Sequence, residues 1–370
     1  MRVILSGGGT AGHINPALAL AEVLAERGHE VFFAGTPHGV ESRLVPQAGL
    51  PFKAFEAGGF DRSHPSSLVS GVAKIARSTR QAKRWFAEVR PDVVVGFGGY
   101  VSIPVARAAE SLGIPVVVHE QNSVMGMANK YLSKRAQTVC VTYGCSADAA
   151  SCPAVCVTGN PVRRSVIESS REAGRAMLGI PDDALVLLVF GGSLGARHIN
   201  EGIVGMRDEL LAREDLRIVH ITGPKELDAV REALALTPEQ EERWQLMGYQ
   251  DRMGETLAAA DVIISRAGAT SLAEISARAI PALLVPFPHA TEDHQTTNAR
   301  AWVDAGCALM MPDDELGTEA FRDQVRRLLD DGDLRASMAA AARSQKTADA
   351  AAKLADVVIA AAARGGAAVQ

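Results

Sequence analysis

The chain has 370 residues and a mass of 39.0 kDa, which is long for a single hydrophobic core and predicts two domains. Its 47% hydrophobic and 22% charged residues, with a formal net charge of -5, exclude a disordered chain and a general nucleic-acid-binding protein. The apolar run Val3–Leu5 is too short for a signal peptide, and no stretch approaches the roughly eighteen apolar residues that span a bilayer. We therefore expect any membrane contact to be peripheral.

The N-terminal half alternates short apolar runs with stretches of helical spacing. This alternation predicts an α/β fold, in which a parallel sheet is covered by helices on both faces. The expected strands are Val3–Leu5, Glu30–Ala34, Asp92–Gly96 and Pro115–His119, and the expected helices are Pro16–Arg27, Leu68–Val89 and Pro104–Leu112.

The same pattern restarts in the second half, after a polar helical stretch at Ser165–Leu178. The sequence therefore predicts two Rossmann-like, doubly wound domains that face each other across a cleft. We place the hinge near Pro161–Ile167, which gives an N-terminal domain at 1–162, a C-terminal domain at 163–345, and a segment at 346–370 whose helix packs back on the N-terminal domain. The expected strands of this half are Leu185–Phe190, Arg217–Ile221, Asp261–Ser265 and Ala282–Pro286.

A glycine-rich loop, GGGTAGH at 7–13, follows the first strand and opens the first helix. Glycine lets the backbone turn tightly and bring its N–H groups to an anion at a helix N-terminus, so the loop predicts a phosphate or oxyanion site. The spacing also fits the GxGxxG motif of dinucleotide-binding proteins. The second strand, however, runs into Gly35 and not into the acid that binds a ribose, which weakens that interpretation. Glycines that serve only helix–strand packing remain an alternative.

His13 lies directly after this loop, where a neutral imidazole could accept a proton. A second glycine turn, FGGYVS at 97–102, follows another strand of the same half and contains Gly98, Gly99 and Tyr100. Ligands of open α/β sheets collect at the carboxyl edge of the strands, so we expect this turn to contribute to the same site, on the acceptor side. A purely structural role is the alternative for His13.

The second half contains another glycine-rich turn after a strand, GGSLGA at 191–196, in which Ser193 could add a hydroxyl to a bound phosphate. A further glycine turn precedes a helix expected to start near Ala269, and Glu274 in its first turns could accept both hydroxyls of a ribose. A polar loop expected at 287–298 contains Gln295 and suggests hydroxyl recognition. The alternatives are a carboxylate that complements the helix dipole and a solvated loop.

The expected helix Leu68–Val89 carries apolar residues on one face and cations on another. A basic surface beside an exposed Trp85 predicts docking on anionic lipid headgroups, and a solvated helix face is the alternative. The cations that define this surface are Lys74, Arg77, Arg80 and Arg84.

No metal and no other cofactor are expected. The five cysteines lack the paired CxxC spacing of a zinc site. Asp331-Gly332-Asp333 resembles the DxD metal motif of some sugar transferases, but it lies between polar helical segments and is interpreted as a turn.

Six motifs, taken in chain order, resemble those of the MurG family, the peptidoglycan N-acetylglucosaminyltransferases of GT-B architecture. They are GGGTAGHINPALALA, GFGGYVSIP, HEQNSVMGMANK, GNPVR, VFGGSLGA and the block at 265–299. The resemblance implies an inverting transfer of N-acetylglucosamine from UDP-N-acetylglucosamine to the 4-hydroxyl of the undecaprenyl-pyrophosphoryl muramyl-pentapeptide, lipid I, to form lipid II. It also implies a peripheral location on the cytoplasmic side of the cell membrane, no nucleic-acid partner, and other cell-wall synthesis proteins as candidate partners.

Position by position, the resemblance assigns the sugar nucleotide to residues of both halves. Ala11 departs from the family pattern, because many relatives have a third glycine there. The implied contacts are Thr10, Ala11 and Gly12 at the sugar end, Asn122 on the transferred sugar, Arg163 from the hinge side, Ser193 on a phosphate, Gln250 beside the uracil, Ala269, Thr270, Ser271, Leu272 and Ala273 under the diphosphate, Glu274 on the ribose and Gln295 on sugar hydroxyls.

The expected chemistry is a direct displacement, in which the proton of the attacking hydroxyl passes to His13 or, alternatively, to Glu120. Helix N-termini and backbone donors would stabilise the leaving UDP without a metal. Two other functions stay open: another UDP-sugar enzyme of this architecture, such as a UDP-N-acetylglucosamine epimerase, and a sugar-nucleotide-binding protein without catalysis.

Overall fold

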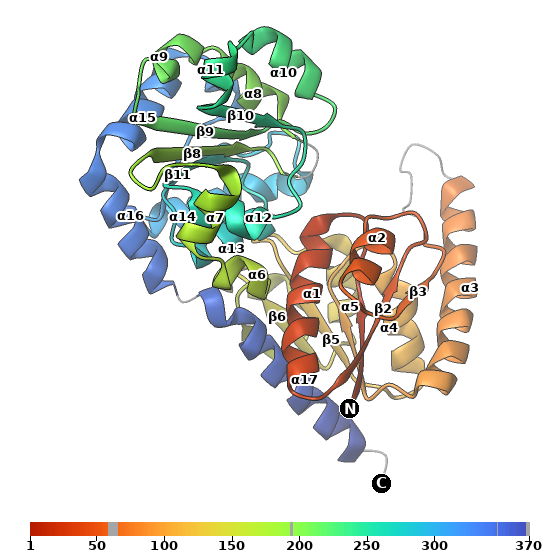
Figure 1. Cartoon of the computed structure of the whole chain (residues 1–370). Coiled ribbons are helices and arrows are strands. Elements are labelled where there is room, and N and C mark those ends of the chain that lie inside the picture. The colour runs from red at the N-terminus through yellow and green to blue at the C-terminus, as the bar shows by residue number, and fades with distance from the viewer. Residues whose placement is uncertain (58–65, 193–194, 346, 368–370) are drawn as a thin grey trace. The chain divides into compact units, whose positions relative to one another are not determined.

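The computed structural model describes residues 1–57, 66–192, 195–345 and 347–367, which form two compact units (Figure 1). The first unit comprises Met1–Arg163 together with Ala348–Gln370, and the second comprises Arg164–Thr347. Each unit contains one parallel sheet with helices packed on it, which confirms the predicted α/β fold with two doubly wound sheets.

The first unit is built on a seven-stranded sheet in the order β3-β2-β1-β4-β5-β6-β7, and all its neighbouring strands pair in parallel. The strands are β1 Arg2–Ser6, β2 Glu30–Gly35, β3 Phe52–Ala54, β4 Val93–Gly96, β5 Val116–Glu120, β6 Thr138–Val141 and β7 Val155–Val157. The helices are α1 Ala11–Glu26, α2 Glu41–Gln47, α3 Ser66–Val89, α4 Ser102–Ser111, α5 Met127–Ser133, a 3-10 turn at Gly144–Ala149, and α17 Ala350–Ala367.

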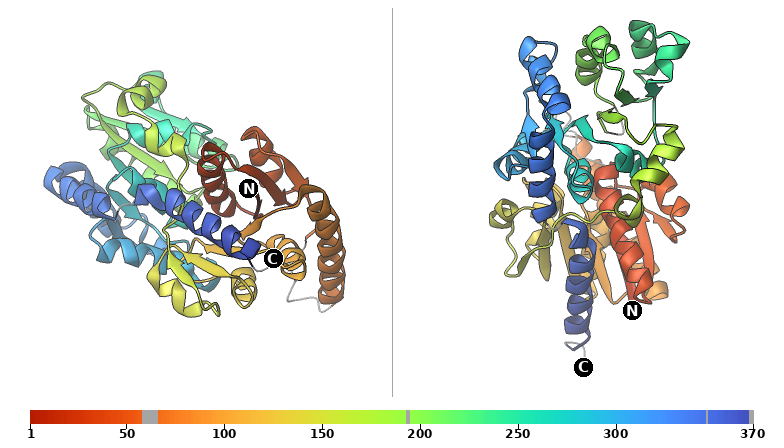
Figure 2. Two further views of the ribbon diagram at one scale, coloured as in Figure 1. Left: turned by 90° about the horizontal axis from the view of Figure 1, so that it is seen from below. Right: turned by 60° about the vertical axis from the view of Figure 1, so that its left-hand side comes forward.

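The valine-rich strands of this sheet are buried on both faces, as crossover helices require. Alternate side chains of β1 point to opposite faces, so Leu5 packs in the core beneath α1 and α17, whereas Ile4 packs in the core beneath α3 and α4. Helix α17 lies beside α1 although the two are far apart in sequence (Figures 1 and 2), and Arg27 of the turn after α1 pairs with Asp356 at 2.6 Å.

The second unit is built on a six-stranded parallel sheet in the order β10-β9-β8-β11-β12-β13. Its strands are β8 Leu185–Phe190, β9 Leu216–Ile221, β10 Trp244–Met247, β11 Val262–Ser265, β12 Ala282–Leu284 and β13 Ala308–Met310. Its helices are α6 Arg164–Glu168, α7 Arg171–Leu178, α8 Arg197–Val204, α9 Arg207–Leu211, α10 Leu227–Leu234, α11 Pro238–Glu241, α12 Met253–Ala259, α13 Ala269–Ala277, α14 His294–Asp304, α15 Glu319–Asp330 and α16 Gly332–Ser344, with 3-10 turns at Thr291–Asp293 and Asp313–Glu315. A further 3-10 turn, Thr347–Asp349, begins at the last residue of this unit and continues into the first unit.

The polar segment expected to be a loop at 287–298 is partly helical, and this prediction is wrong in its second half. Helix α14 begins at His294, so Gln295 and Asn298 lie on its first turns. The polar character misled the prediction because these side chains bond inward: Asn298 is fully buried, and its Nδ2 donates to the carbonyl of Ala267 at 3.2 Å. The Asp331-Gly332-Asp333 segment was expected to be a turn, but it begins a helix: Gly332 and Asp333 are the first residues of α16, and the Asp331 carboxylate caps this helix by accepting from the N–H of Leu334 at 2.8 Å.

The strand orders decide where ligand-binding loops meet. In each sheet the later strands are added first on one side of the unit's first strand and then on its other side. As a result, β1 lies between β2 and β4, and β8 lies between β9 and β11. Such switch points open a crevice at the carboxyl ends of the strands, where ligands of this fold class bind. The loops after β1 and β4, and those after β8 and β11, are therefore the candidate ligand-binding loops. Within the described residues, no helix is long and apolar enough to cross a bilayer.

Candidate functional site

The two glycine turns of the first unit pack directly against each other. Gly98 and Gly99 have φ angles of +103° and +77°, in the left-handed region that side chains other than glycine rarely adopt. A Cβ atom added at Gly99 would lie 2.5 Å from the carbonyl oxygen of Gly8. Only glycine therefore allows the loop after β4 to approach the loop after β1 this closely. Tyr100 follows in the same turn and is half-buried.

His13 lies in the first turn of α1 with its ring over the second glycine turn. Its Nδ1 lies 2.9 Å from the carbonyl oxygen of Gly8, and a Cβ atom added at Gly98 would lie 3.1 Å from its Nε2. A carbonyl oxygen can only accept a hydrogen bond, so Nδ1 carries the proton of the neutral ring. Nε2 then keeps its lone pair and can accept a proton, which is the chemistry that the sequence predicted for this residue.

The loop that precedes His13 is hydrogen-bonded to an acid that the sequence analysis did not single out. Glu41, the first residue of α2, is fully buried, and its Oε2 accepts from the backbone N–H of Gly9 at 3.3 Å. The expectation that this loop presents its N–H groups to a bound anion is thus wrong for Gly9, which already faces a carboxylate of the chain. Thr10 is exposed in this loop, and Ala11 and Gly12 begin α1 half-exposed.

Glu120 holds the loop that follows β5. Its buried carboxylate accepts four hydrogen bonds, two from the backbone N–H and Nδ2 of Asn122 at 3.0 and 3.3 Å, one from the N–H of Gly126 at 3.0 Å and one from Nδ2 of Asn129 at 2.8 Å. Both oxygens of this carboxylate accept hydrogen bonds from the loop, so Glu120 holds Asn122 in place. Asn129 was not singled out, although it stands in the HEQNSVMGMANK motif.

His119, at the end of β5, ties the sheet to the GNPVR segment. Its Nε2 donates to the carbonyl of Gly159 at 3.0 Å, and its Nδ1 accepts from Nε2 of Gln121 at 3.1 Å. Burial lowers the pKa of His119 from 6.5 to about 4, because the charged ring would lose its hydration.

Arg163, the last residue of the GNPVR segment, contacts α1. Its Nε donates to Oε1 of Glu22 at 2.7 Å, which anchors this side chain within the first unit.

In the second unit, α13 begins directly after the turn that follows β11, as the sequence predicted. The side chains of Ala269, Leu272 and Ala273 are buried, so these residues could reach a diphosphate only through their backbone. The first turn of an α-helix has N–H groups that the helix itself does not use, and the ladder of α13 starts with the bond from Leu272 N to Gly268 O at 3.0 Å. Thr270 and Ser271 are half-exposed on the same turn.

Three further residues of this unit were assigned to the sugar-nucleotide donor. The first, Glu274, lies on α13 and is 9% exposed. Oε1 of Gln250 accepts from the N–H of Arg252 at 2.9 Å, which fixes the turn between β10 and α12. Ser193 lies outside the described residues.

Gln295 joins the two loops that flank α13 and β12. Its Oε1 accepts from the N–H of Ala267 at 3.2 Å and from the N–H of Phe287 at 3.0 Å. The amide oxygen is thus engaged by the backbone, and only Nε2 of this side chain remains to meet a sugar hydroxyl.

Arg266, which the sequence analysis missed, is buried beneath the loops after β11 and β12. It is 8% exposed, and its Nη1 donates to the carbonyls of Val285 and Pro286 at 3.3 and 3.2 Å and to the carboxylate of Asp313. Its guanidinium carbon lies 5.5 Å from the centre of the Phe287 ring. The only available signal was an arginine directly after a strand, which does not distinguish a ligand contact from this structural role.

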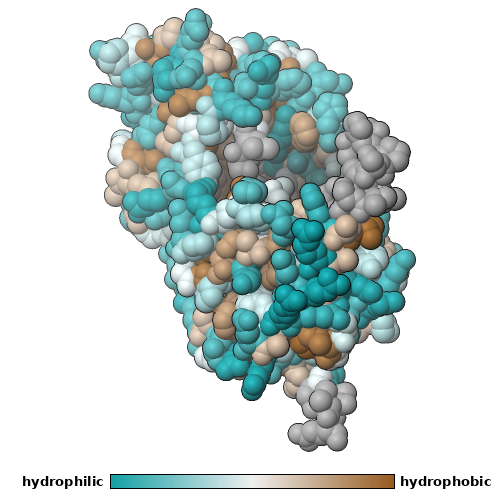
Figure 3. Space-filling view, turned by 90° about the vertical axis from the view of Figure 1, so that its right-hand side faces the viewer, coloured by the Kyte–Doolittle hydropathy of each residue, from teal (hydrophilic) through white to brown (hydrophobic). Residues whose placement is uncertain are grey.

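Helix α3 shows the expected cations, but the expectation of an exposed Trp85 is wrong. Trp85 is 9% exposed and packs against Phe32, Phe55 and Phe86 with ring centroids 5.7 to 6.4 Å apart. It follows Ala82 by three residues, so helical geometry puts it on the buried side. Figure 3 views the molecule from the side on which α3 lies, and hydrophilic side chains dominate that surface. The exposed cations of the helix are Lys74, Arg77, Arg80 and Arg84.

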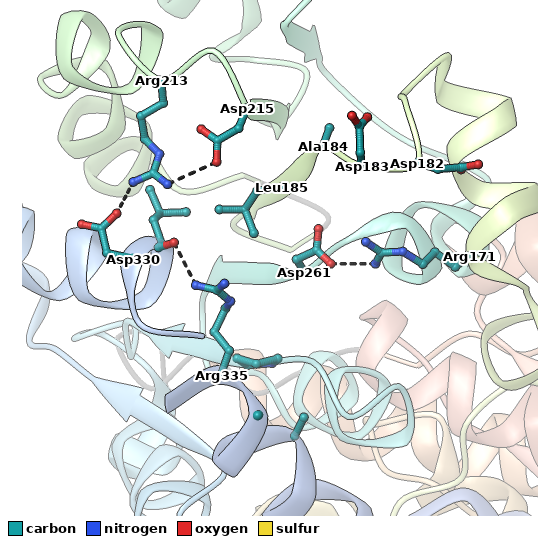
Figure 4. Close-up of a pocket in the computed structure, with 14 residues that line it drawn as sticks. Arg171, Asp182, Asp183, Ala184, Leu185, Arg213, Asp215, Asp261, Asp330 and Arg335 are labelled. Atoms are coloured by element: carbon teal, nitrogen blue, oxygen red, sulfur yellow. Dashed lines mark hydrogen bonds and ion pairs between the residues drawn. The ribbon is translucent and has the colours of Figure 1, made fainter. Parts of the chain in front are cut away.

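A polar hollow of about 660 Å³ lies elsewhere on the second unit (Figure 4). Its lining includes Leu185, the first residue of β8, and Asp261, which directly precedes β11. The hollow therefore opens at the amino edge of the sheet, away from the glycine turns. Ion pairs cross it, including Arg171–Asp261 at 2.7 Å and Arg213–Asp215 at 3.4 Å. Among the described residues, no group of three or more His, Cys, Asp or Glu is placed to hold a metal ion.

Comparisons with known proteins agree with this geometry. Residues 3–141 match the glycosyltransferase family 28 N-terminal domain and residues 186–354 match its C-terminal domain. A protein of Leuconostoc mesenteroides named UDP-N-acetylglucosamine–N-acetylmuramyl-(pentapeptide) pyrophosphoryl-undecaprenol N-acetylglucosamine transferase is 42% identical over 87% of this chain and 88% of its own. The crystal structure of Acinetobacter baumannii MurG is 30% identical, with a TM-score of 0.73 over 96% of this chain and 99% of that one. A putative UDP-N-acetylglucosamine 2-epimerase of Listeria monocytogenes, 16% identical with a TM-score of 0.71 over 95% and 93% of the two chains, shares the fold.

The buried His119 makes the stability of the first unit depend on pH. Between pH 6.5 and about 4 the unfolded chain binds a proton on this residue that the folded chain does not, so stability falls as the pH falls through that window. From pH 6.5 to pH 5 the loss is about 2 kcal/mol, at ~1.4 kcal/mol per pH unit. Urea unfolding followed by Trp85 fluorescence, with Trp244 and Trp302 replaced by Phe, measures this loss.

His119→Gln in the same background is the control, because its side chain is neutral at both pH values and can still donate to Gly159. The variant is expected to be less stable at pH 7 but to lose about 2 kcal/mol less than the parent on going to pH 5. An equal loss in both proteins would contradict the assignment of this pH dependence to His119.

Proposed function

The chain belongs to glycosyltransferase family 28 and, within it, to the MurG family, and we propose that it transfers N-acetylglucosamine from UDP-N-acetylglucosamine to lipid I, giving lipid II. The observation that carries the mechanism is the tautomer of His13, whose Nδ1 is bonded to the carbonyl of Gly8 at the switch point of the first sheet. A proton acceptor at that place suits a reaction in which a hydroxyl becomes the nucleophile.

In the proposed reaction, the 4-hydroxyl oxygen of the muramyl sugar forms a bond to the anomeric carbon of N-acetylglucosamine. The bond between that carbon and the β-phosphate oxygen breaks, and UDP leaves with the electron pair. Nε2 of His13 takes the hydroxyl proton. Attack from the face opposite the nucleotide inverts the anomeric centre, so no covalent enzyme intermediate is needed.

The sugar nucleotide is proposed to bind at the switch point of the second sheet. The N-terminal turn of α13 supports a diphosphate there, because a helix N-terminus presents N–H groups and a positive dipole end. Glu274, five residues into that helix, would accept the ribose hydroxyls, and Nε2 of Gln295 would donate to a sugar hydroxyl. The same N–H groups would stabilise the negative charge that develops on departing UDP, which is the role of a metal in some other sugar transferases.

The two alternatives from the sequence gain no specific support. The likeness to the epimerase, at 16% identity, concerns the fold alone. A non-catalytic binding protein would have no use for a histidine whose tautomer is fixed by the loop that holds it.

The acceptor is a membrane lipid, and we propose that the exposed cations of α3 bring the enzyme to the cytoplasmic face of the cell membrane as a peripheral protein. The support is electrostatic: Lys74, Arg77, Arg80 and Arg84 are exposed along one helix of a chain whose net charge is -5. Basic residues near an anionic surface contribute about 1 kcal/mol each. Other cell-wall synthesis proteins remain candidate partners of this location.

Transfer of labelled sugar to a short-chain analogue of lipid I tests the function directly. We expect a disaccharide product with inverted anomeric configuration, formed equally well with and without EDTA, because backbone donors stabilise the leaving group. An epimerase would instead convert the nucleotide sugar without acceptor. Binding of UDP-N-acetylglucosamine with no product would favour the non-catalytic alternative.

His13→Asn is expected to lower kcat by about 10²- to 10³-fold, since a positioned general base contributes gains of that order. The KM for UDP-N-acetylglucosamine is expected to change little, because the asparagine amide can still donate to Gly8 and the nucleotide part of the donor is proposed to bind to the other unit. Steady-state kinetics measures both constants. His38→Asn, which changes an exposed histidine of the same unit, is the control. A His13→Asn enzyme with wild-type turnover would remove this residue from the base role.

Reversal of three cations of α3, in the variant Arg77→Glu/Arg80→Glu/Arg84→Glu, is expected to weaken binding to vesicles of anionic lipid. At about 1 kcal/mol per residue, the loss is roughly 3 kcal/mol, or about 100-fold in the partition coefficient. Sedimentation with vesicles measures it. The matched control, Lys225→Glu/Arg231→Glu/Arg300→Glu, makes the same change in net charge on the second unit. Equal loss in both variants would refute α3 as the docking surface.

A further inference from the structure

Glu41 is a buried acid that the proposed chemistry does not use. Its side chain is fully buried at the start of α2, and its carboxylate accepts from uncharged donors. Oε1 accepts from the backbone N–H of Thr36 at 2.9 Å and from its hydroxyl at 2.6 Å, and Oε2 accepts from the N–H of Gly9 at 3.3 Å. Burial of a charge is costly unless hydrogen bonds compensate it, so a carboxylate at this position calls for a physical reason.

The backbone around Glu41 is shaped to admit its carboxylate. A Cβ atom added at Gly8 would lie 2.7 Å from Oε1, and one added at Gly39 would lie 2.2 Å from Oε2. On its other side, Gly8 is covered by Gly99, whose added Cβ would lie 2.5 Å from the Gly8 carbonyl oxygen. The Gly8 peptide is therefore fixed between a carboxylate and the second glycine turn, and cannot rotate without breaking one of these contacts.

The Gly8 carbonyl is also the partner of Nδ1 of His13, at 2.9 Å. We propose that Glu41 is a positioning residue, which holds the Gly8–Gly9 segment so that its carbonyl keeps the proton of His13 on Nδ1 and leaves Nε2 to accept the proton of the acceptor. The catalytic part of this proposal rests on the function proposed above. The structural part, control of the His13 tautomer, can be measured without any reaction.

Glu41→Gln is the sharpest test, because the size of the side chain is kept. The amide oxygen will face Thr36, which supplies two of the three donors. The amide NH₂ group must then face the N–H of Gly9, and two donors cannot bond each other. The substitution therefore disturbs the loop at Gly8–Gly9 and leaves the contact with β2 in place.

The first readout is the tautomer of His13 by ¹⁵N and ¹³C imidazole NMR at alkaline pH, with the His13 signals assigned from their loss in His13→Asn. We expect a dominant Nδ1–H tautomer in the wild type and a mixture with the Nε2–H tautomer in Glu41→Gln. Thr36→Val, which removes only the hydroxyl donor to Glu41, is expected to shift the population in the same direction by less. It keeps the test available if Glu41→Gln does not fold.

The second readout is transfer kinetics. Misplacement of a catalytic group by about 1 Å can cost about 100-fold in rate, so kcat is expected to fall by about 10- to 100-fold in Glu41→Gln, with the acid limb of its pH profile displaced. The KM for UDP-N-acetylglucosamine is expected to change less than kcat, because the nucleotide part of the donor is proposed to bind to the second unit. A loss of stability alone would lower the active fraction without moving the pH profile.

Asp92→Asn is the matched control. Asp92 also accepts a backbone N–H in the same sheet, that of Arg2 at 2.6 Å, but at the amino end of β1. We expect it to change neither the tautomer nor the pH profile. A folded Glu41→Gln or Thr36→Val protein with the wild-type tautomer ratio would overturn the proposal. If the wild type transfers no sugar but Glu41→Gln still changes the tautomer, the proposed function fails while control of His13 by Glu41 stands.

Discussion

The hydrogen bond between Nδ1 of His13 and the carbonyl of Gly8 is the contact on which the first half of the site depends. It exists because β1 and β4 are neighbours in a parallel sheet, so the loops after them emerge at the same edge. The approach of those loops requires the absence of side chains at Gly98 and Gly99. The ring of His13 can then lie over one loop while it bonds the other, and its second nitrogen is the atom that we propose accepts the proton.

Both units use side chains to fix the backbone of the loops at the carboxyl edge of their sheets. In the first unit Glu120 bonds the N–H groups of Asn122 and Gly126. In the second, Gln295 bonds those of Ala267 and Phe287. Loops fixed in this way lose little freedom when a ligand arrives, and donors that are already oriented need not reorganise as charge develops. The same sheet topology thus places different groups at the switch points of the two units.

The sequence was informative where local chemistry and position agree. Runs such as Val93–Val95 predicted buried strands, and glycines directly after strands predicted the turns at the carboxyl ends of those strands, since both signals depend on neighbouring residues. His13 was proposed as a proton acceptor because it adjoins such a turn. Neither the pairing of the two turns nor the tautomer of His13 could be read from the sequence, because both depend on residues far apart along the chain.

Polar residues in irregular sequence were the main source of error. Asn298 belongs to a segment that was expected to be a polar loop for hydroxyl recognition, but its side chain is buried against a carbonyl of a distant turn. Trp85 looked available to lipid because it adjoins arginines, but the helix rotates it into a cluster of aromatic rings from Phe32, Phe55 and Phe86. Glu41 gave no signal at all, because its donors lie on two other segments, at Gly9 and Thr36.

The burial of Trp85 has a consequence for how an enzyme of this kind would stay near its substrate. Without an aromatic anchor at that position, the proposed attraction to headgroups would come from the cations of α3, which salt screens over about 8 Å at physiological ionic strength. Attachment of that kind would be short-lived and would vary with the local share of anionic lipid. At the proposed location, the protein would then leave one patch of membrane and land on another, so its search for the lipid acceptor would combine diffusion in water with diffusion along the bilayer.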